Sequence, residues 1–336
     1  MKSPDFFRRA GLAAGIALAA LLVACGGEDT APAETRPELA NVEPLTPVLD
    51  HGQLTEDLVI LAADDMQGRG VGTPGGAKAR EYIISRFEEI GLKPLGAEGY
   101  VHSFVAAAPK TDRGFAEAAN VIGLVPGSAA GVIVVTAHYD HLGVRDGEIF
   151  NGADDNASGV AAMLAIAAEF MKTPPKHPIV FAALDAEEVG LRGAEDFVQQ
   201  PPGPIRISGV GLNVNLDMVS RSASRELYAS GTYHYPFLKP YLERVAAASP
   251  ISLRLGHDAP EEGVNDWTQQ SDHYAFHLRG VPFVYFGVED HPDYHKASDT
   301  SDNVNQTFFA NSAETIAAAI RAFDENLDAI FDEAGR

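Results

Sequence analysis

Carboxylate and imidazole side chains follow several apolar segments of this chain, at the point where each segment ends. Crowded carboxylates repel one another and raise each other's pKa, so together they favour a bound cation or a proton. Histidines and carboxylates without a thiolate suit Zn²⁺ or another borderline divalent ion. The groups in question are His138 and Asp140, Glu187 and Glu188, Asp217, and His291 with His295, while Asp154 and Asp155 stand just before a helical pattern.

The order of the elements explains how these side chains could meet. Short apolar runs alternate with segments of helical periodicity, which indicates an α/β protein whose sheet is covered on both faces. In open α/β sheets, ligands gather at the carboxyl ends of the strands. We expect strands over 131–140, 178–185, 211–217 and 281–287, and helices over 74–92, 157–172, 192–200, 236–248 and 312–331.

Each of these polar residues, taken alone, has an ordinary structural explanation. An Asp before a helix usually caps it, and a His at a strand end usually hydrogen-bonds within a loop. Their convergence on one edge of one sheet favours a metal site instead. Three carboxylate ligands leave a site with one dication negative, whereas two dications leave room for one hydroxide. The charge count therefore favours two metals, about 3.5–4 Å apart.

The first residues resemble an export signal. Lys2, Arg8 and Arg9 precede an apolar segment over 10–24, which is shorter than the roughly 20 residues that a spanning helix needs. The small residue before Cys25 in "LVAC" resembles the lipobox of bacterial lipoproteins, in which the cysteine becomes the lipidated N-terminus. Cys25 is the only cysteine of the chain. The alternative is a plain secretory signal with a chance cysteine.

Three regions follow from this pattern. We expect a lipoprotein signal peptide over 1–24, a flexible tether rich in Pro, Glu and Thr over 25–50, and a single catalytic domain over 51–336. Such a protein would be exported and held at the cell envelope by its lipid, at the outer membrane facing the periplasm. The sequence leaves Sec and twin-arginine export open.

The chain is strongly acidic, with 25 Lys and Arg against 47 Asp and Glu and a formal net charge of −22. Without residues 1–24 the balance is 22 to 46, which gives −24. Because phosphate contacts need a surplus of Lys and Arg, nucleic acid is excluded as a partner. Metal cations and cationic groups of substrates fit this charge better.

Five motifs, in their order and spacing, resemble those of the di-zinc aminopeptidases related to aminopeptidase Y and to the secreted bacterial leucine aminopeptidases. They are "AHYDHLG", "NGADDNASGVAAML", "LDAEEVGLRGAEDF", "NLDMVS" and "DYHKASDT". "GRGVGTPGGAKAREYI" also resembles that family's N-terminal segment, so the resemblance covers about residues 54–330. It implies three layers, with a mostly parallel mixed sheet flanked by helices, and two Zn²⁺ per chain.

The resemblance also implies a ligand for each metal. His138 and Asp217 would hold one zinc ion, and Glu188 and His295 the other. Asp154, the first acid of the paired motif, would bridge the two ions. The substrates would be peptides with a free N-terminus, and the reaction would be hydrolysis of their first peptide bond by a monomeric catalytic domain.

Three further residues receive roles from the same resemblance. Glu187 would be the general base for the attacking water. Asp140 would hold His138 by a hydrogen bond and set its tautomer. Tyr294, just before the last ligand, matches a tyrosine that stabilises the oxyanion in some members of the family.

Other polar residues of the motifs are expected to be structural or supporting. Asp185 has no role implied by the family. Asp272 and Asp299 are candidates for contacts next to the ligands or for turn residues. His141, His273 and His291 match no ligand position, and Pro292 argues that the His291 region is a loop rather than a helix.

Three alternatives use the same or a related fold. A glutaminyl cyclase, which is a mono-zinc acyl transferase, has a tryptophan-rich pocket, but this chain has only Trp267 and places Tyr294 beside the last ligand. A carboxypeptidase usually carries an inserted domain, and none is visible between Asp217 and Ser271. A catalytically silent binding protein would have lost ligands, whereas every ligand position here is occupied.

Overall fold

The computed structural model describes residues 42–107 and 115–336. The expected signal peptide, Cys25 and the tether up to residue 41 lie outside the described residues. Among the helices of the described part, none is both long and apolar enough to cross a membrane.

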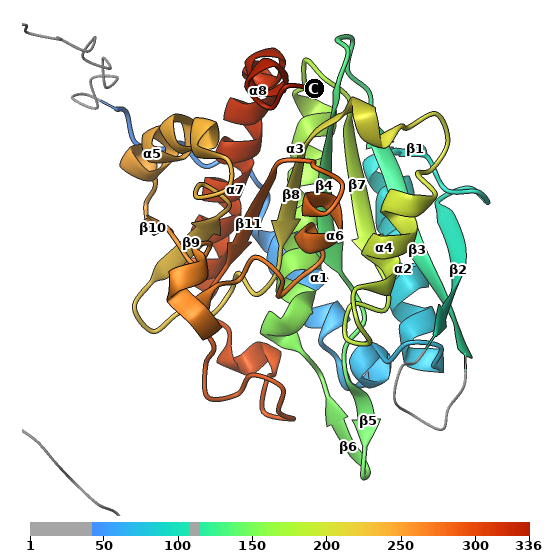
Figure 1. Cartoon of the computed structure of the whole chain (residues 1–336). Helices are drawn as coiled ribbons and strands as arrows, with labels where there is room; N and C mark the ends of the chain where they lie inside the picture. Colours follow the sequence, from blue (N-terminus) through green and yellow to red (C-terminus); the bar gives the residue numbers. More distant parts are fainter. Residues whose placement is uncertain (1–41, 108–114) are drawn as a thin grey trace, which may run out of the picture. The chain divides into compact units, whose positions relative to one another are not determined.

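A nine-stranded mixed sheet forms the centre of the domain (Figure 1). The strand order is β1-β3-β7-β4-β8-β11-β9-β10, and β2 pairs with β3. The four central strands β7, β4, β8 and β11 are parallel, whereas β3 and β9 run antiparallel to their central neighbours. The strands are β1 (Lys93–Pro94), β2 (Val101–Ala107), β3 (Phe115–Val125), β4 (Val132–His138), β7 (Ile179–Leu184), β8 (Val210–Leu216), β9 (Glu226–Ser230), β10 (Ser252–Leu255) and β11 (Phe283–Gly287).

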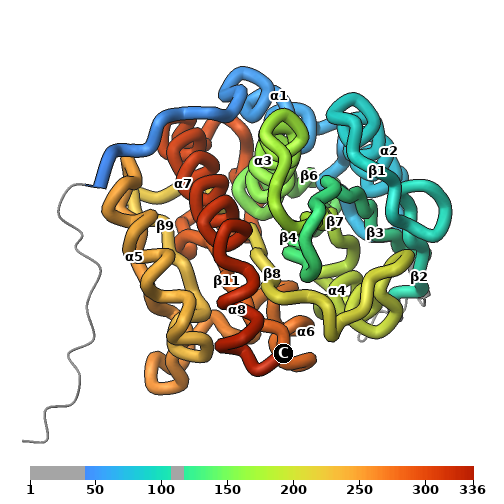
Figure 2. Tube along the Cα trace, turned by 90° about the horizontal axis from the view of Figure 1, so that it is seen from above, coloured from blue at the N-terminus to red at the C-terminus, as the bar shows by residue number. Residues whose placement is uncertain are grey.

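Helices cover both faces of this sheet (Figure 2), which confirms the expected α/β fold with a central mixed sheet flanked by helices. A separate hairpin of β5 (Gly143–Arg145) and β6 (Glu148–Phe150) projects beyond the sheet (Figure 1). The α-helices are α1 (His51–Leu61), α2 (Pro74–Ile90), α3 (Gly159–Lys172), α4 (Arg192–Gln199), α5 (Lys239–Ala248), α6 (His273–His277), α7 (Gln306–Glu325) and α8 (Leu327–Glu333). Shorter turns of 3-10 or π type are η1 (Asp64–Arg69), η2 (Ala153–Ser158), η3 (Ile207–Gly209), η4 (Pro236–Leu238), η5 (Pro260–Asn265) and η6 (Ser301–Asn303).

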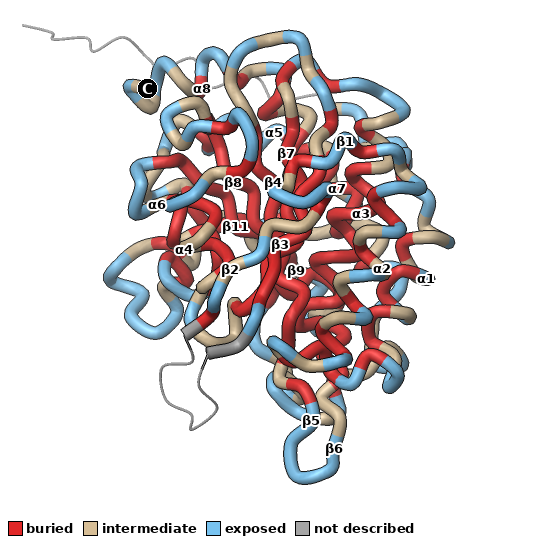
Figure 3. The backbone as a smooth tube through the Cα atoms, turned by 90° about the vertical axis from the view of Figure 1, so that its right-hand side faces the viewer, coloured by how far each residue is buried: buried red, intermediate tan, exposed pale blue. Residues whose placement is uncertain are grey.

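Side chains of the central strands alternate between two apolar layers. In β4, Ile133, Val135 and Ala137 join a large core that includes α1, α2, α3 and α7, whereas Val134 joins a smaller core with α4 and α6. The central strands are therefore buried along their length (Figure 3). Burial on both faces explains why these strands appear in the sequence as continuous apolar runs.

The parallel strands end at the same edge of the sheet. His138 is the last residue of β4, Asp185 follows β7 directly, and Asp217 follows β8 directly. Because β4 is hydrogen-bonded to both β7 and β8, the loops after these three strands start side by side. This arrangement is what brings polar residues from distant parts of the sequence together.

Residues 42–50, expected to belong to the tether, are bound to the domain. The buried carboxylate of Glu314 on α7 accepts the backbone N–H groups of Val48 and Leu49, each at 3.0 Å. The ordered part therefore begins before the expected boundary at residue 51. Composition alone did not show this, because the partners, Glu314 and the backbone oxygen of Ala248, lie far along the sequence.

Two other regions differ from the sequence-based expectation. Between Asp217 and Ser271, where only the helix over 236–248 was expected, the strands β9 and β10 extend the sheet on either side of α5 in the sequence. The single helix expected over 312–331 is two helices, α7 and α8. The first of them begins at Gln306, since the Asn305 side chain accepts the Phe308 N–H and caps it.

Candidate metal centre

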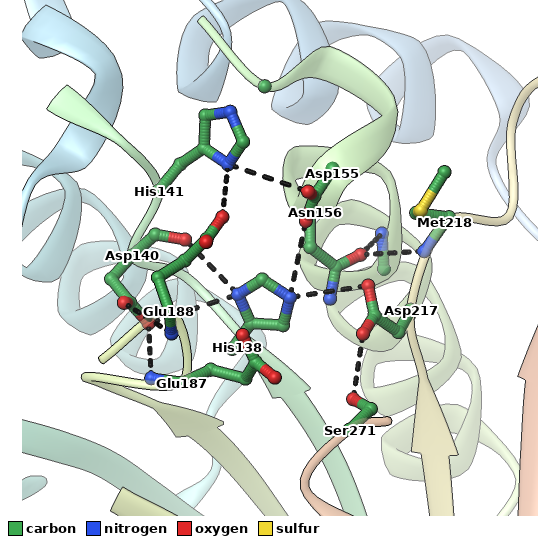
Figure 4. A network of polar contacts seen from close by, with 12 residues as sticks. His138, Asp140, His141, Asp155, Asn156, Glu187, Glu188, Asp217, Met218 and Ser271 are labelled. Atoms are coloured by element: carbon green, nitrogen blue, oxygen red, sulfur yellow. Dashed lines mark hydrogen bonds and ion pairs between the residues drawn. The ribbon is translucent and has the colours of Figure 1, made fainter. Parts of the chain in front are cut away.

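Two groups of metal-binding side chains share one carboxylate at the carboxyl edge of the sheet (Figure 4). His138, Asp155 and Asp217 form the first group, and His141, Asp155 and Glu188 form the second. In each group the ligand atoms lie within 4.8 Å of one another. A carboxylate shared between two such groups is suited to bridge two metal ions.

The first group joins the ends of the neighbouring strands β4 and β8. His138 Nε2 lies 3.2 Å from Asp217 Oδ1 and 3.4 Å from Asp155 Oδ1. Ser271 Oγ donates to Asp217 Oδ2 at 2.7 Å, which holds the other oxygen toward His138. All three members of the group are buried, so a bound cation would be largely shielded from water.

The second group surrounds Glu188, in the turn after β7. Glu188 Oε1 lies 2.7 Å from His141 Nδ1. His295 Nε2 lies 3.1 Å from Asp155 Oδ2 and 3.6 Å from Glu188 Oε2. Two imidazoles thus face the pair formed by Asp155 and Glu188. The structure brings His141, expected to be structural, into direct contact with this group.

The carboxylate shared by the two groups is that of Asp155 and not that of Asp154, which was expected to bridge. Asp154 Oδ1 accepts hydrogen bonds from Ser220 N at 2.8 Å and Ser220 Oγ at 2.7 Å, and its Oδ2 faces His291 Nε2 at 3.2 Å. The reason is the irregular backbone of η2 (Ala153–Ser158), which turns consecutive side chains in different directions. His291 is accordingly a partner of Asp154 and lies outside both ligand groups.

Asp140 contacts His138 as expected, but through its backbone oxygen rather than its carboxylate. Its carboxylate is 3.8 Å from His138 Nδ1, too far for a hydrogen bond, whereas its backbone oxygen is 3.1 Å away. With Nδ1 donating to that carbonyl, Nε2 faces Asp217 and is the nitrogen that could bind a metal ion. The Asp140 carboxylate instead accepts the backbone N–H groups of Glu187 and Glu188 at 3.0 and 3.2 Å, and so holds the turn that carries both glutamates.

Buried acids around the ligands support the loops. Asp299 accepts the backbone N–H groups of Asp154 and Asp155 at 3.1 Å each, and burial raises its pKa to about 6. Asp272 is fully buried, and neither of its oxygens has a hydrogen-bond partner among the described residues. Burial raises the pKa of Asp272 to about 7. Asp185 accepts from Ala119 N and from a tyrosine hydroxyl, which agrees with a structural role.

The donor set fits divalent metal ions. Glu188 Oε1 and His141 Nδ1 are only 2.7 Å apart, yet neither atom has a hydrogen-bond partner within residues 42–107 and 115–336. Such atoms are directed at a common third position rather than at each other. Nitrogen and carboxylate oxygen donors in two groups with one shared carboxylate suit two zinc ions.

Glu187 lies beside both groups without being a member of either. It lines a cavity of about 350 Å³ together with His138, Glu188 and Asp217. Burial raises the pKa of Glu187 well above its usual range; the nearby His138 opposes this effect, and Asp272 adds to it. A carboxyl group with a raised pKa in a cavity is suited to accept and return a proton.

Aromatic side chains form the opposite part of the cavity wall. Trp267, Tyr285 and Tyr294 line it, together with Met218 and Val288. Sequence analysis missed Tyr285, because an aromatic residue inside an apolar strand usually belongs to the core. Burial raises the pKa of Tyr285 well above its usual range, so its hydroxyl remains a hydrogen-bond donor.

The segment that carries these residues matches a known family. The model of Peptidase family M28 matches residues 120–320, more than half of the chain. The chain belongs to Peptidase family M28. All members of the two ligand groups, and also Glu187 and His295, lie within the matched residues.

Among curated proteins, this M28 chain is similar to the "Probable lipoprotein aminopeptidase LpqL" of Mycobacterium tuberculosis. The two are 25% identical over 305 residues, which cover 80% of this chain and 58% of the relative. The M28 chain spans about half the length of the curated relatives it matches, between 40% and 58% for the first three.

Solved structures show the same fold. BSAP, a zinc aminopeptidase from Bacillus subtilis, has a TM-score of 0.64 at 18% identity, with 82% of this M28 chain and 95% of that chain covered. The glutaminyl cyclase of Porphyromonas gingivalis has a TM-score of 0.65 at 17% identity, with 82% and 99% covered. These similarities establish the fold and do not separate the two activities.

Proposed function

We propose that this M28 chain is a zinc-dependent aminopeptidase that hydrolyses the first peptide bond of peptides with a free N-terminus. The observation that carries the proposal is the pair of ligand groups that share Asp155, with the unligated carboxyl of Glu187 beside them. The name of LpqL and the family membership support the same reaction class.

Four of the proposed ligands belong to the two groups, and His295, which faces Asp155 and Glu188, is the fifth. His138 and Asp217 would hold one zinc ion, Glu188 and His295 the other, and Asp155 would bridge them. We assign His295 rather than His141 as the cavity-side ligand because His295 lines the cavity, whereas His141 is fully buried beside Glu188. When bound, the zinc ions would make a water molecule more acidic and polarise the substrate carbonyl.

Glu187 would move the proton in this reaction. Its carboxylate would accept a proton from the water as the water oxygen attacks the carbonyl carbon. When the carbon–nitrogen bond breaks, the same proton would pass to the leaving amine, so that Glu187 ends as it began. The Asp140 carboxylate supports this role, because it fixes the backbone N–H groups of Glu187 and Glu188 and thereby their relative positions.

Zinc content and activity test the proposal together. The chain as isolated should contain about two zinc ions, cleave aminoacyl anilides, lose activity on chelation and regain it with added zinc. A folded chain without affinity for zinc would refute the proposal. Peptides with N-terminal glutamine form a second arm of the assay: cyclisation without hydrolysis, in a chain holding one zinc ion, would favour the cyclase.

The two tyrosine hydroxyls on the cavity wall provide a further prediction. The ring of Tyr294 stacks on His295 with centroids 3.9 Å apart, which places it next to a proposed ligand. The Tyr285 hydroxyl makes only a weak contact, 3.5 Å from the backbone oxygen of Asp217. We expect Tyr294→Phe to lower kcat by roughly 10²–10³-fold, as for loss of an oxyanion donor, and Tyr285→Phe to have a smaller effect.

Zinc content and KM of both variants serve as controls for this comparison, because neither hydroxyl belongs to a ligand group. A near-normal kcat for Tyr294→Phe with a large loss for Tyr285→Phe would transfer the oxyanion role to Tyr285.

For the location of the protein, we propose export and lipid attachment at Cys25, with the catalytic domain held at the cell envelope, at the outer membrane facing the periplasm. The signal-like residues 1–24 and the small residue before Cys25 support this proposal. The relative from Mycobacterium tuberculosis that is named a probable lipoprotein adds to that support.

A further inference from the structure

Arg69 is the largest fully buried side chain of the described residues, with 1% of its surface exposed. It belongs to the "GRGVGTPGG" motif, which has no part in the proposed chemistry, and it does not line the cavity beside the metal centre. A buried arginine is costly unless all its donors are used. Its contacts therefore indicate what the residue holds in place.

The Arg69 guanidinium donates only to backbone carbonyl groups. Nε donates to Tyr139 O at 2.8 Å, and Nη1 donates to Leu61 O at 2.7 Å and to Asn151 O at 2.6 Å. Nη2 donates to Gly152 O at 2.8 Å. The carbonyl of Leu61 is the last of α1, and a cation is favourable at a helix C-terminus.

The other three carbonyls lie on the two sides of the β5–β6 hairpin, where it leaves and rejoins the domain. Tyr139 directly follows the ligand His138, and Gly152 precedes the ligand Asp155 by three residues. Arg69 thus connects the two ends of the hairpin. The hairpin lies between these two residues in the sequence, so its closure contributes to the separation of the ligand-bearing segments, together with the Asp299 contacts to Asp154 and Asp155.

The backbone of Gly68 and Arg69 also contacts the base of the β5–β6 hairpin. Arg69 O accepts the His141 N–H at 3.3 Å, so the main chain and the side chain hold the same strand end. Gly68 has φ +63°, and a Cβ there would lie 2.3 Å from Phe150 O and 2.6 Å from Gly143 O. This close approach to both strands of the hairpin requires glycine.

Charge favours the same arrangement. Burial lowers the pKa of Arg69 to about 10, and Asp155 and Asp299 oppose this effect, so the guanidinium remains charged at neutral pH. The positive charge offsets part of the repulsion among the buried carboxylates. No aliphatic side chain of similar size could replace either its charge or its four hydrogen bonds.

We propose that Arg69 is a positioning residue for the metal centre, which closes the base of the β5–β6 hairpin and so holds His138 and Asp155 at the separation that zinc requires. The inference rests on the proposed function, because it needs a chain that binds zinc. It predicts that zinc affinity depends on a residue that touches neither metal nor substrate.

Zinc affinity of the full chain, measured by competition with a chromophoric chelator, tests this inference. We expect Arg69→Met to bind zinc about 10- to 100-fold more weakly than the wild type, as is typical when groups that orient ligands are lost. Arg69→Lys should lie between the two, because its single ammonium group can reach only some of the carbonyls. Circular dichroism would establish that each variant is folded.

Arg86 offers a matched control. It is another buried arginine, pairs with Asp57 at 2.9 Å and with Glu89, and contacts neither end of the hairpin. Arg86→Met should lose stability and keep wild-type zinc affinity. Equal affinities of folded Arg69→Met and Arg86→Met would overturn the inference. If Arg69→Met does not fold, wild-type affinity in Arg69→Lys would overturn it.

Zinc binding by the wild type and by the Arg69 variants tests the proposed function and the positioning role separately. A wild-type chain that binds no zinc would refute the proposed function. Tight zinc binding by the wild type, unchanged in the Arg69 variants, would refute the positioning role alone.

Discussion

The Glu187→Gln variant is expected to bind zinc as the wild type does and to lose roughly 10²–10⁴-fold in kcat, the range that general acid–base catalysis contributes. The amide keeps the shape of the side chain but cannot accept the proton of the attacking water. Glu187 belongs to neither ligand group, so its loss should leave both groups intact. Steady-state kinetics on aminoacyl anilides and zinc analysis of the same preparation measure the two effects.

The adjacent residue is the natural control, because Glu187 and Glu188 share the turn held by Asp140. Glu188→Gln should lose zinc together with activity, since Glu188 is a member of the second group. A near-normal kcat for Glu187→Gln would remove that residue from the role of general base. Loss of zinc from Glu187→Gln would make it a ligand instead.

The second large effect concerns the bridging carboxylate. Asp155→Asn should weaken zinc binding more than the roughly 10- to 100-fold typical of residues next to a ligand, because Asp155 belongs to both groups. Activity should fall with the zinc content. Competition with a chelator, at a pH where the wild type retains its metal, measures the loss.

Asp154→Asn is the matched control, one residue earlier in the same turn. Its carboxylate binds Ser220 and faces His291, so the variant should keep zinc affinity and lose about 1 kcal/mol of stability at the Ser220 hydrogen bonds. Strong loss of zinc in Asp154→Asn, with near-normal zinc binding in Asp155→Asn, would restore the assignment that the motif alone implied.

The sequence alone does not distinguish the roles of these two aspartates. The "ADDNAS" segment predicts one metal-binding aspartate, but it contains two adjacent aspartates that could serve. The choice depends on the backbone of η2, whose irregular φ and ψ angles direct Asp155 toward His138 and Asp154 toward Ser220. Spacing along the chain carries no information on such a local turn.

Contacts between distant segments could not be predicted from the sequence for a related reason. His141 follows His138 by three residues, beyond the strand, and its contact with Glu188 depends on how the loop after β4 is folded. That loop is held by Arg69, seventy residues away in the chain. Tyr285 reaches the cavity only because β11 lies beside β8, and Asp217 directly follows β8.

Sequence alone was enough to predict the alternation of strands and helices, the residue types at the strand ends and the kind of metal that they suit. These features depend on local periodicity and on side-chain chemistry, which can be read residue by residue. The folded chain was needed to show which acid the two ligand groups share, which carboxylate holds the glutamate turn and which tyrosines line the cavity. Those outcomes depend on loop geometry and on strand order, because both are set by packing between segments that are remote in the chain.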